Sequence, residues 1–430
     1  MTEHDPHSPG NTFTDGNGIK RRTIIAGAAW TIPVVALATA TPAMAASNDL
    51  TLAFDKSSYQ GVDCGTISGV KVTATRNGQA APGESITVSL ADGYTFSDGS
   101  TSYTTTSGSD GSVTLPDIKV PQNAGSSTFT ATGGGATATA SVSSTSNAVA
   151  YSYNGAANQT NQETNVPNGA TPVGWRSFID SSGSLWDNGV RIRSDVASAV
   201  GLINGNGDHL ISYVTKDGVA YSFNGANGQT SQETNVPNGA KPVGWRAFLE
   251  SDGSLWDNGI RIRSDVASAI GLINADGSHL ISYVTKGGVA YSFNGTTGQT
   301  GQEFNVPNGA TPVGWRAFLE PNGSLWDNGN RIRSDVASAY GLINSNGDHL
   351  ISYVTKDGVA LSYNGGNGQT NQETNVPNGA KPVGWRAFLE PNGSLWDNGV
   401  RIRSDVTKAR GLIYMDNNNA HLISYVTGHC

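Results

Sequence analysis

The segment His209-Leu-Ile-Ser-Tyr-Val-Thr-Lys-Asp-Gly-Val-Ala-Tyr-Ser-Phe-Asn224 predicts two β-strands, residues 209–215 and 219–224, joined by a tight Lys-Asp-Gly turn. Tyr, Val and Ile favour a pleated, half-buried surface, and Asp-Gly is a typical hairpin turn. The same hairpin returns at residues 279–294 and 349–364. A fourth copy is divided, because its second strand (149–154) begins the repeated region and its first strand (421–427) ends it. If the two halves pair in space, the repeats close into a ring.

Four copies of one unit fill the chain from residue 148 to its end. Tyr151-Ser-Tyr-Asn-Gly returns at Tyr221, Tyr291 and Leu361, which gives a period of 70 residues. Such internal duplication is the first basis for assigning the fold, because a fixed period is the signature of repeat architectures. The fourth copy differs near its end, where Tyr414-Met-Asp-Asn-Asn-Asn-Ala420 replaces a shorter turn. Terminal units are often atypical in this way because they cap or close an array.

Each unit predicts more strands than one four-stranded blade can hold. In the second copy we expect strands at residues 219–223, 233–236, 243–249, 254–257, 260–263, 267–273 and 279–285. Residues 248–258 weakly echo residues 213–224, which is consistent with two small blades per copy. A β-propeller solves the edge-strand problem by radial repetition, and its closure accounts for the divided hairpin. A β-solenoid is the rival fold, but it leaves that division unexplained.

A family resemblance points the same way. The pattern of His209, Asp217-Gly218 and Tyr221, followed by Asn224 and Gly228-Gln229, resembles the repeats of the regulator of chromosome condensation family. The chain departs from that family at Phe223-Asn224, where Trp-Gly is usual. The resemblance covers most of residues 148–427 and implies a propeller, not a nucleotide-exchange activity.

Residues 47–146 predict a separate β-sandwich. Strand-like runs at 50–54, 69–76, 85–90, 101–107, 111–115, 127–131 and 136–142 alternate with Gly- and Asp-rich turns. Seven short strands at this spacing are typical of an immunoglobulin-like fold. The motifs at residues 70–88, 105–113, 129–132 and 136–143 resemble the bacterial Ig-like domains of invasins and intimins. That resemblance implies a spacer or stalk at a cell surface.

Composition excludes some classes of function. Only 14% of the 430 residues are charged and 55 are glycine, a profile that suits many short strands and turns. A net charge of -8 argues against a nucleic-acid-binding surface. No phosphate loop, nucleophile elbow or cofactor motif is visible, so we expect no cofactor.

The first 46 residues predict an export signal. Arg21-Arg22 precede an apolar run to about residue 40, and Ala43-Met44-Ala45 places small residues at a cleavage site. This segment resembles a twin-arginine signal and looks like those of secreted proteins from high-GC Gram-positive (actinobacterial-type) bacteria. An ordinary secretory signal is the alternative, because Ile24-Ile25 stands where Phe-Leu is usual. We therefore expect an extracellular or cell-surface protein, with no membrane span in the mature chain.

The chain has two cysteines, Cys64 and Cys430. Outside the cytoplasm, such a pair is typically a disulfide. Closure of the ring places Cys430 beside the junction with the sandwich. The end of a sandwich strand near Cys64 faces that junction, so we predict a Cys64–Cys430 bridge.

Each copy repeats Gly-Trp-Arg, then Leu-Trp-Asp-Asn-Gly, then Arg-Ile-Arg-Ser-Asp. An aromatic ring beside amide, carboxylate and guanidinium groups suits a carbohydrate site, because the ring packs on a sugar face while the polar groups bind its hydroxyls. The competing interpretation is that each Trp belongs to a blade core. The candidate ligand-binding residues lie at alternate positions of the second motif, and these are Trp186, Asn188, Trp256, Asn258, Trp326, Asn328, Trp396 and Asn398.

Other repeated side chains suggest no enzyme. His209, His279, His349 and His421 lack further ligands at metal spacing, so no metal site is predicted. The repeated Glu163, Glu233, Glu303 and Glu373 could form carboxylate pairs for glycoside hydrolysis. Four equivalent copies argue against this, because an enzyme needs one asymmetric site.

The sequence therefore predicts a secreted, non-catalytic, all-β protein: an Ig-like sandwich (residues 47–146) followed by a closed β-propeller of four 70-residue copies (147–430). The leading hypothesis is a multivalent lectin-like or adhesive module for a glycan, cell-envelope or host-surface ligand. The alternative is a structural or protein-interaction component of the envelope without a small ligand, and a glycan-processing enzyme ranks last. The oligomeric state is not predicted.

Overall fold

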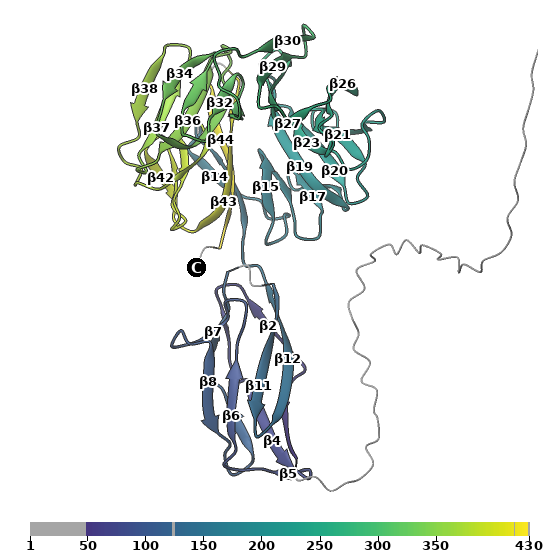
Figure 1. Cartoon of the computed structure of the whole chain (residues 1–430), viewed down its shortest axis with the longest axis vertical. Helices are drawn as coiled ribbons and strands as arrows, with labels where there is room; N and C mark the ends of the chain where they lie inside the picture. The colour runs from purple at the N-terminus through teal and green to yellow at the C-terminus, as the bar shows by residue number, and fades with distance from the viewer. Residues whose placement is uncertain (1–48, 123–124, 417, 429–430) are drawn as a thin grey trace, which may run out of the picture. The chain divides into compact units, whose positions relative to one another are not determined.

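The computed structural model describes residues 49–122, 125–416 and 418–428, and its regular structure there is entirely β (Figure 1). The predicted export signal, His429 and Cys430 lie outside the described residues. No helix in the described part of the chain is long and apolar enough to cross a membrane. The predicted domain boundaries at residues 46 and 146 stay predictions.

The first part of the chain contains all seven strands that the sequence predicts there, namely β1 (Leu50–Phe54), β4 (Lys71–Arg76), β6 (Ser85–Ser89), β8 (Ser102–Thr106), β9 (Ser112–Thr114), β11 (Ser126–Gly133) and β12 (Ala136–Thr145). Five further strands were not predicted, namely β2 (Ser58–Val62), β3 (Thr66–Ile67), β5 (Gln79–Ala80), β7 (Thr95–Phe96) and β10 (Ile118–Lys119). The largest sheet has the order β2-β12-β11-β6-β8, in which β2 runs parallel to β12.

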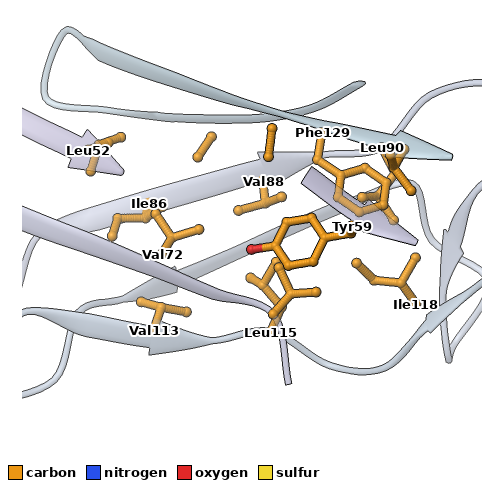
Figure 2. Packing of buried hydrophobic residues seen from close by; sticks show 14 of the residues in the cluster. Leu52, Tyr59, Val72, Ile86, Val88, Leu90, Val113, Leu115, Ile118 and Phe129 are labelled. Atoms are coloured by element: carbon orange, nitrogen blue, oxygen red, sulfur yellow. The ribbon is translucent and has the colours of Figure 1, made fainter. Parts of the chain in front are cut away.

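One apolar core holds these strands together. Figure 2 shows Ile86, Val88 and Phe129 of the largest sheet packed with Val72 and Val113 of the second sheet. Alternate residues of β4 and β6 point into this core, as the two-residue period of a strand requires. The immunoglobulin-like assignment itself stays a prediction.

The rest of the chain forms eight four-stranded antiparallel sheets, two per copy. We call four of them long blades, because each inner strand has eight or nine residues. From the inner to the outer strand they are β19 (Val196–Ile203), β20 (His209–Thr215), β21 (Ala220–Asn224), β22 (Gln229–Gln232); β27 (Val266–Ile273), β28 (His279–Thr285), β29 (Ala290–Asn294), β30 (Gln299–Gln302); β35 (Val336–Ile343), β36 (His349–Thr355), β37 (Ala360–Asn364), β38 (Gln369–Gln372); and β43 (Val406–Tyr414), β44 (Ala420–Thr427), β13 (Ala150–Asn154), β14 (Gln159–Gln162).

The other four sheets alternate with these, and we call them short blades. In the same order they are β15 (Thr171–Gly174), β16 (Ser177–Ile179), β17 (Leu185–Asp187), β18 (Val190–Arg193); β23 (Lys241–Gly244), β24 (Ala247–Leu249), β25 (Leu255–Asp257), β26 (Ile260–Arg263); β31 (Thr311–Gly314), β32 (Ala317–Leu319), β33 (Leu325–Asp327), β34 (Asn330–Arg333); and β39 (Lys381–Gly384), β40 (Ala387–Leu389), β41 (Leu395–Asp397), β42 (Val400–Arg403).

The eight blades form a closed ring. Each inner strand contacts the inner strands of the blades before and after it, and β15 contacts both β19 and β43. The divided hairpin makes this closure, because β13 pairs antiparallel with β44, from Ala150 opposite Val426 to Asn154 opposite Leu422. The predictions of a closed propeller and of two blades per copy are confirmed.

Glycine allows the inner strands to approach one another. A Cβ atom added to Gly201 would lie 2.9 Å from the Cα atom of Gly174, and Gly271 would meet Gly244 at the same distance. Real Cβ atoms essentially never come that close, so these positions require glycine. The Leu-Ile pairs that follow, such as Leu202-Ile203, then meet on the axis and form a central apolar cluster with Met415.

Two of the predicted strands are wrong. Residues 243–249 form two strands, β23 and β24, because the backbone turns at Trp245-Arg246, where Arg246 has a φ of +50°. Residues 233–236 are also not a strand, and the outer strand β22 ends just before them. At Trp245-Arg246 a non-glycine residue adopts the left-handed conformation, which is uncommon. The sequence therefore contains no ordinary turn signal at this position.

Candidate binding surfaces

The tryptophans of the Leu-Trp-Asp motif lie between adjacent blades. Trp186 is opposite Phe178 in the sheet and packs, partly buried, on a cluster that contains Val166 and Val426. Its indole Nε1 donates a hydrogen bond to Asp180 Oδ2 at 3.0 Å. The equivalent indoles of Trp256, Trp326 and Trp396 donate to Glu250, Glu320 and Glu390. Each indole thus has an intramolecular partner, and its predicted contact with a ligand stays a prediction.

The candidate asparagines have different partners. Asn188 and Gly189 form the tip of the β17–β18 hairpin with φ values of +48° and +74°, as a two-residue type I′ turn requires. Asn188 Nδ2 lies 3.4 Å from His209 Nδ1, and Asn258, Asn328 and Asn398 have the same neighbour in their copies. Each Asn therefore lies beside a histidine, whereas the Trp two residues earlier in the sequence donates a hydrogen bond to an acidic residue.

Each histidine is held by an aspartate. His209 Nδ1 donates to Asp187 Oδ1 at 2.7 Å, and the same pair recurs in every copy. In the first copy Ser177 Oγ also donates to Asp187 Oδ1, at 2.6 Å, where the other copies have alanine. The serine is therefore bonded to the carboxylate and not to the imidazole, an arrangement unlike that of an activated nucleophile. No group of three potential metal-ligating side chains occurs within the described ranges.

The repeated glutamates are paired with arginines. The Glu233 side chain is 2% exposed and accepts hydrogen bonds from Arg246 Nε at 2.7 Å and Nη2 at 3.0 Å. Ser222 Oγ donates to the same carboxylate at 2.7 Å. This bond to Glu233 raises the pKa of Arg246. The same three-residue network recurs around Glu163, Glu303 and Glu373. These carboxylates hold the arginines of the left-handed turns in position and are not free for acid–base chemistry.

Sequence reasoning missed a stack of charged and aromatic groups between a short blade and the long blade that follows it. Arg193 lies over the ring of Tyr221, 4.7 Å from its centroid, and that ring stacks on Tyr213 at 5.4 Å. Asp195 Oδ1 accepts a hydrogen bond from Arg193 Nε at 2.6 Å, which lowers the pKa of Asp195. The stack recurs in two other copies, whereas Leu361 replaces the outer tyrosine in the copy that contains Tyr353. The repeated Arg-Ile-Arg-Ser-Asp motif indicated the charged half of this stack, but the aromatic half lies in another strand.

The hairpin tips of the short blades carry exposed apolar side chains. Val190, Ile260 and Val400 are 63%, 71% and 67% exposed, and Asn330 occupies the equivalent position in the remaining copy. An exposed arginine follows each of them, namely Arg191, Arg261, Arg331 and Arg401. We call these four pairs the tip surface. It was not predicted, although the variation between Val, Ile and Asn is visible in the sequence.

The sheet order defines the class of protein, which is an all-β protein with an eight-bladed propeller in its described residues. No family model matches the sequence, and no curated protein matches it. Propellers are among the solved structures that it resembles. The Dos1 propeller is 9% identical, with a TM-score of 0.34 over 61% of this chain and 93% of its own.

Two further structures show a similar likeness. The Cps50 (Swd1) propeller domain of Myceliophteria thermophila is 11% identical, with a TM-score of 0.32 over 53% of this chain and 96% of its own. A quinonprotein alcohol dehydrogenase-like protein of Bacteroides thetaiotaomicron is 9% identical, with a TM-score of 0.28 over 73% and 93%. TM-scores this low carry no argument about function.

Proposed function

We propose that this is a secreted, non-enzymatic binding protein whose propeller presents one repeated surface, apolar in three of its four copies, to a protein partner at a cell surface. The observation that carries the proposal is the tip surface. Three of the four tips expose a branched apolar side chain by more than half, next to an exposed arginine. Arginine is enriched at protein interfaces, and an exposed branched apolar side chain beside it offers area that a partner can bury.

The internal pairing of the other repeated groups supports a binding role without catalysis. The buried glutamates are bonded to arginines, and each histidine is bonded to an aspartate. Four copies of one surface suit repeated contacts, since linked weak sites can raise avidity by roughly 10²–10⁴ where geometry permits. Secretion is proposed from the arginine pair and apolar run before residue 46, which lie outside the described residues.

The experiment uses a triple variant, Val190→Asn, Ile260→Asn and Val400→Asn. Asn330 already occupies this position in the third copy, so the substitution suits the turn. The mature chain is tested against immobilised cell-wall polysaccharides, a glycan array and extracellular-matrix proteins. We expect binding to a protein, weakened by about tenfold or more in the triple variant and only partly in single variants. Protein binding that is equal in the triple variant and the wild type would contradict the tip surface.

A lectin-like role of the tryptophan sites is the second candidate. It is supported by the partial exposure of Trp186 and by Arg191, its cross-strand neighbour, because a ring beside a planar polar group suits a sugar. The matched test is a Trp186→Phe, Trp256→Phe, Trp326→Phe and Trp396→Phe variant whose fold is checked by circular dichroism. Glycan binding that is lost in this variant but kept in the triple tip variant would select the lectin-like role.

A further inference from the structure

The four near-identical copies differ at one position on the propeller axis. The inner strands β19, β27, β35 and β43 all end in Gly-Leu-Ile or its extension, and the residue before that glycine is Val200, Ile270, Tyr340 or Arg410. All four of these residues line a single central cavity of about 210 Å³. The lining of this cavity is therefore not fourfold symmetric, because each copy contributes a different side chain.

The wall of this central cavity is otherwise apolar. Leu202, Leu272, Leu342 and Leu412 line it, together with Pro242 and Val243. The Leu-Ile pairs and Met415 line a second, much smaller space on the axis, with a volume of about 20 Å³. That is about the volume a single water needs, so larger molecules fit only in the wider cavity.

Arg410 is the one positively charged residue in the lining of this cavity. Its Nε atom is buried and has no hydrogen-bond partner, and its Nη2 atom lies 3.5 Å from the carbonyl oxygen of Gly201, at the limit of a hydrogen bond. No ion pair found among the described residues includes it. Tyr340, the other polar side chain there, already donates its hydroxyl to the Gly411 carbonyl at 3.2 Å.

Arg410 as a whole is partly exposed, but its Nε atom is buried without a partner. Burial of a charged donor is costly when nothing replaces the water that it loses. Other arginines of the same propeller have a carboxylate, as Arg193 has Asp195 and Arg246 has Glu233. A carboxylate that accepts two hydrogen bonds from the guanidinium fork would satisfy Arg410 in the same way. An apolar body on that carboxylate would contact the leucines.

We propose that the central cavity binds one small monocarboxylate with an apolar body per chain, through Arg410. The stoichiometry of one distinguishes this site from the fourfold tip surface, and the two proposals stand on different residues. A doubly charged inorganic anion suits the site less, because the apolar wall offers nothing to replace its hydration.

The test is isothermal titration of the mature chain with benzoate and hexanoate, with benzyl alcohol, hexanol, phosphate and sulfate as comparison ligands. We expect saturable binding of a carboxylate at one site, with the matching alcohol and the inorganic anions weaker by about tenfold or more. The variant Arg410→Ile introduces the side chain that the second copy has at this position, and it should abolish the binding while the melting temperature stays equal or rises.

A second variant guards against misfolding of the first. Val200→Tyr introduces the third copy's side chain on β19, the long-blade inner strand next to that of Arg410. The larger ring fills the cavity and should block the carboxylate with Arg410 unchanged. The proposal is overturned if neither carboxylate binds, if phosphate or the alcohols bind as well as the carboxylates, or if both variants bind like the wild type.

Discussion

Each long blade buries one tyrosine hydroxyl that makes no hydrogen bond of good geometry, on Tyr213, Tyr283, Tyr353 and Tyr425, although a threonine of the outer strand lies near each of them. An unsatisfied buried hydroxyl costs about 1–3 kcal/mol, so its removal should not destabilise the fold. We expect Tyr213→Phe, which keeps the stacked ring, to leave the free energy of unfolding unchanged or to raise it by about 1 kcal/mol. Urea denaturation at neutral pH measures this, and a clear loss of stability would show that the hydroxyl has a partner.

The same tyrosines predict instability in alkali. Burial raises the pKa of each of the four hydroxyls. In the unfolded chain tyrosine loses its proton near pH 10, before the folded protein does, so the unfolded state then binds fewer protons. Stability is therefore fully present below about pH 10 and falls as the pH rises through the folded pKa. Urea midpoints from neutral to alkaline pH should fall in that window, and less steeply in Tyr213→Phe; a flat profile would contradict the prediction.

Two kinds of ion pair allow a matched comparison at the residue scale. The carboxylate of Glu233 is nearly fully buried, whereas Asp195 is 44% exposed beside Arg193. Glu233→Ala leaves Arg246 and Ser222 without their acceptor and should cost about 2–3 kcal/mol, since the arginine keeps some water. Asp195→Ala should cost about 1 kcal/mol or less. Equal losses in thermal or urea unfolding would argue against the structural role of the glutamate.

The inner strands depend on glycine at their closest approach. Gly201→Ala places a Cβ atom 2.9 Å from the Gly174 backbone, and a backbone atom cannot rotate away. We expect a loss of about 1–3 kcal/mol from the forced shift of one strand. Gly287→Ala is the control, because its Cβ would meet no atom closer than 3.9 Å. A melting temperature that falls equally in both variants would contradict the close packing at the axis.

Strands and their succession were predictable because hydrophobic alternation and Asp-Gly turns are local. The hairpin of β20 and β21 and the divided hairpin of β13 and β44 follow directly from such signals. The turn at Trp245-Arg246 was not predictable, since it depends on the Glu233 network, in which Glu233 and Arg246 are 13 residues apart. The Arg193–Tyr221–Tyr213 stack was missed for a similar reason, because it needs the register between separate strands. The cavity residue Arg410 stands out in an alignment of the copies, but only the ring shows that it faces the axis.

At the scale of the whole molecule, we predict that Cys64 and Cys430 form a disulfide. The bridge would close a loop of most of the chain, and the chain-entropy account gives it about 4–5 kcal/mol of stabilisation. Mass spectrometry of the non-reduced mature protein after proteolysis should find the linked peptides, and Cys64→Ser should lower the urea midpoint. Two alkylatable thiols in the folded secreted protein would refute the pairing.

Closure of the ring by its two ends is the central claim, and a designed cross-link tests it most directly. Ser152 lies opposite Ser424 in the β13–β44 pair, just as Ser212 lies opposite Ser222 in an undivided hairpin. We would replace each pair with cysteines in a Cys64→Ser, Cys430→Ser background and measure disulfide formation by non-reducing electrophoresis and mass spectrometry. The account predicts that both pairs cross-link within one chain to a similar extent. Cross-linking of the Ser212–Ser222 pair alone, or only between chains for the Ser152–Ser424 pair, would contradict a closed propeller.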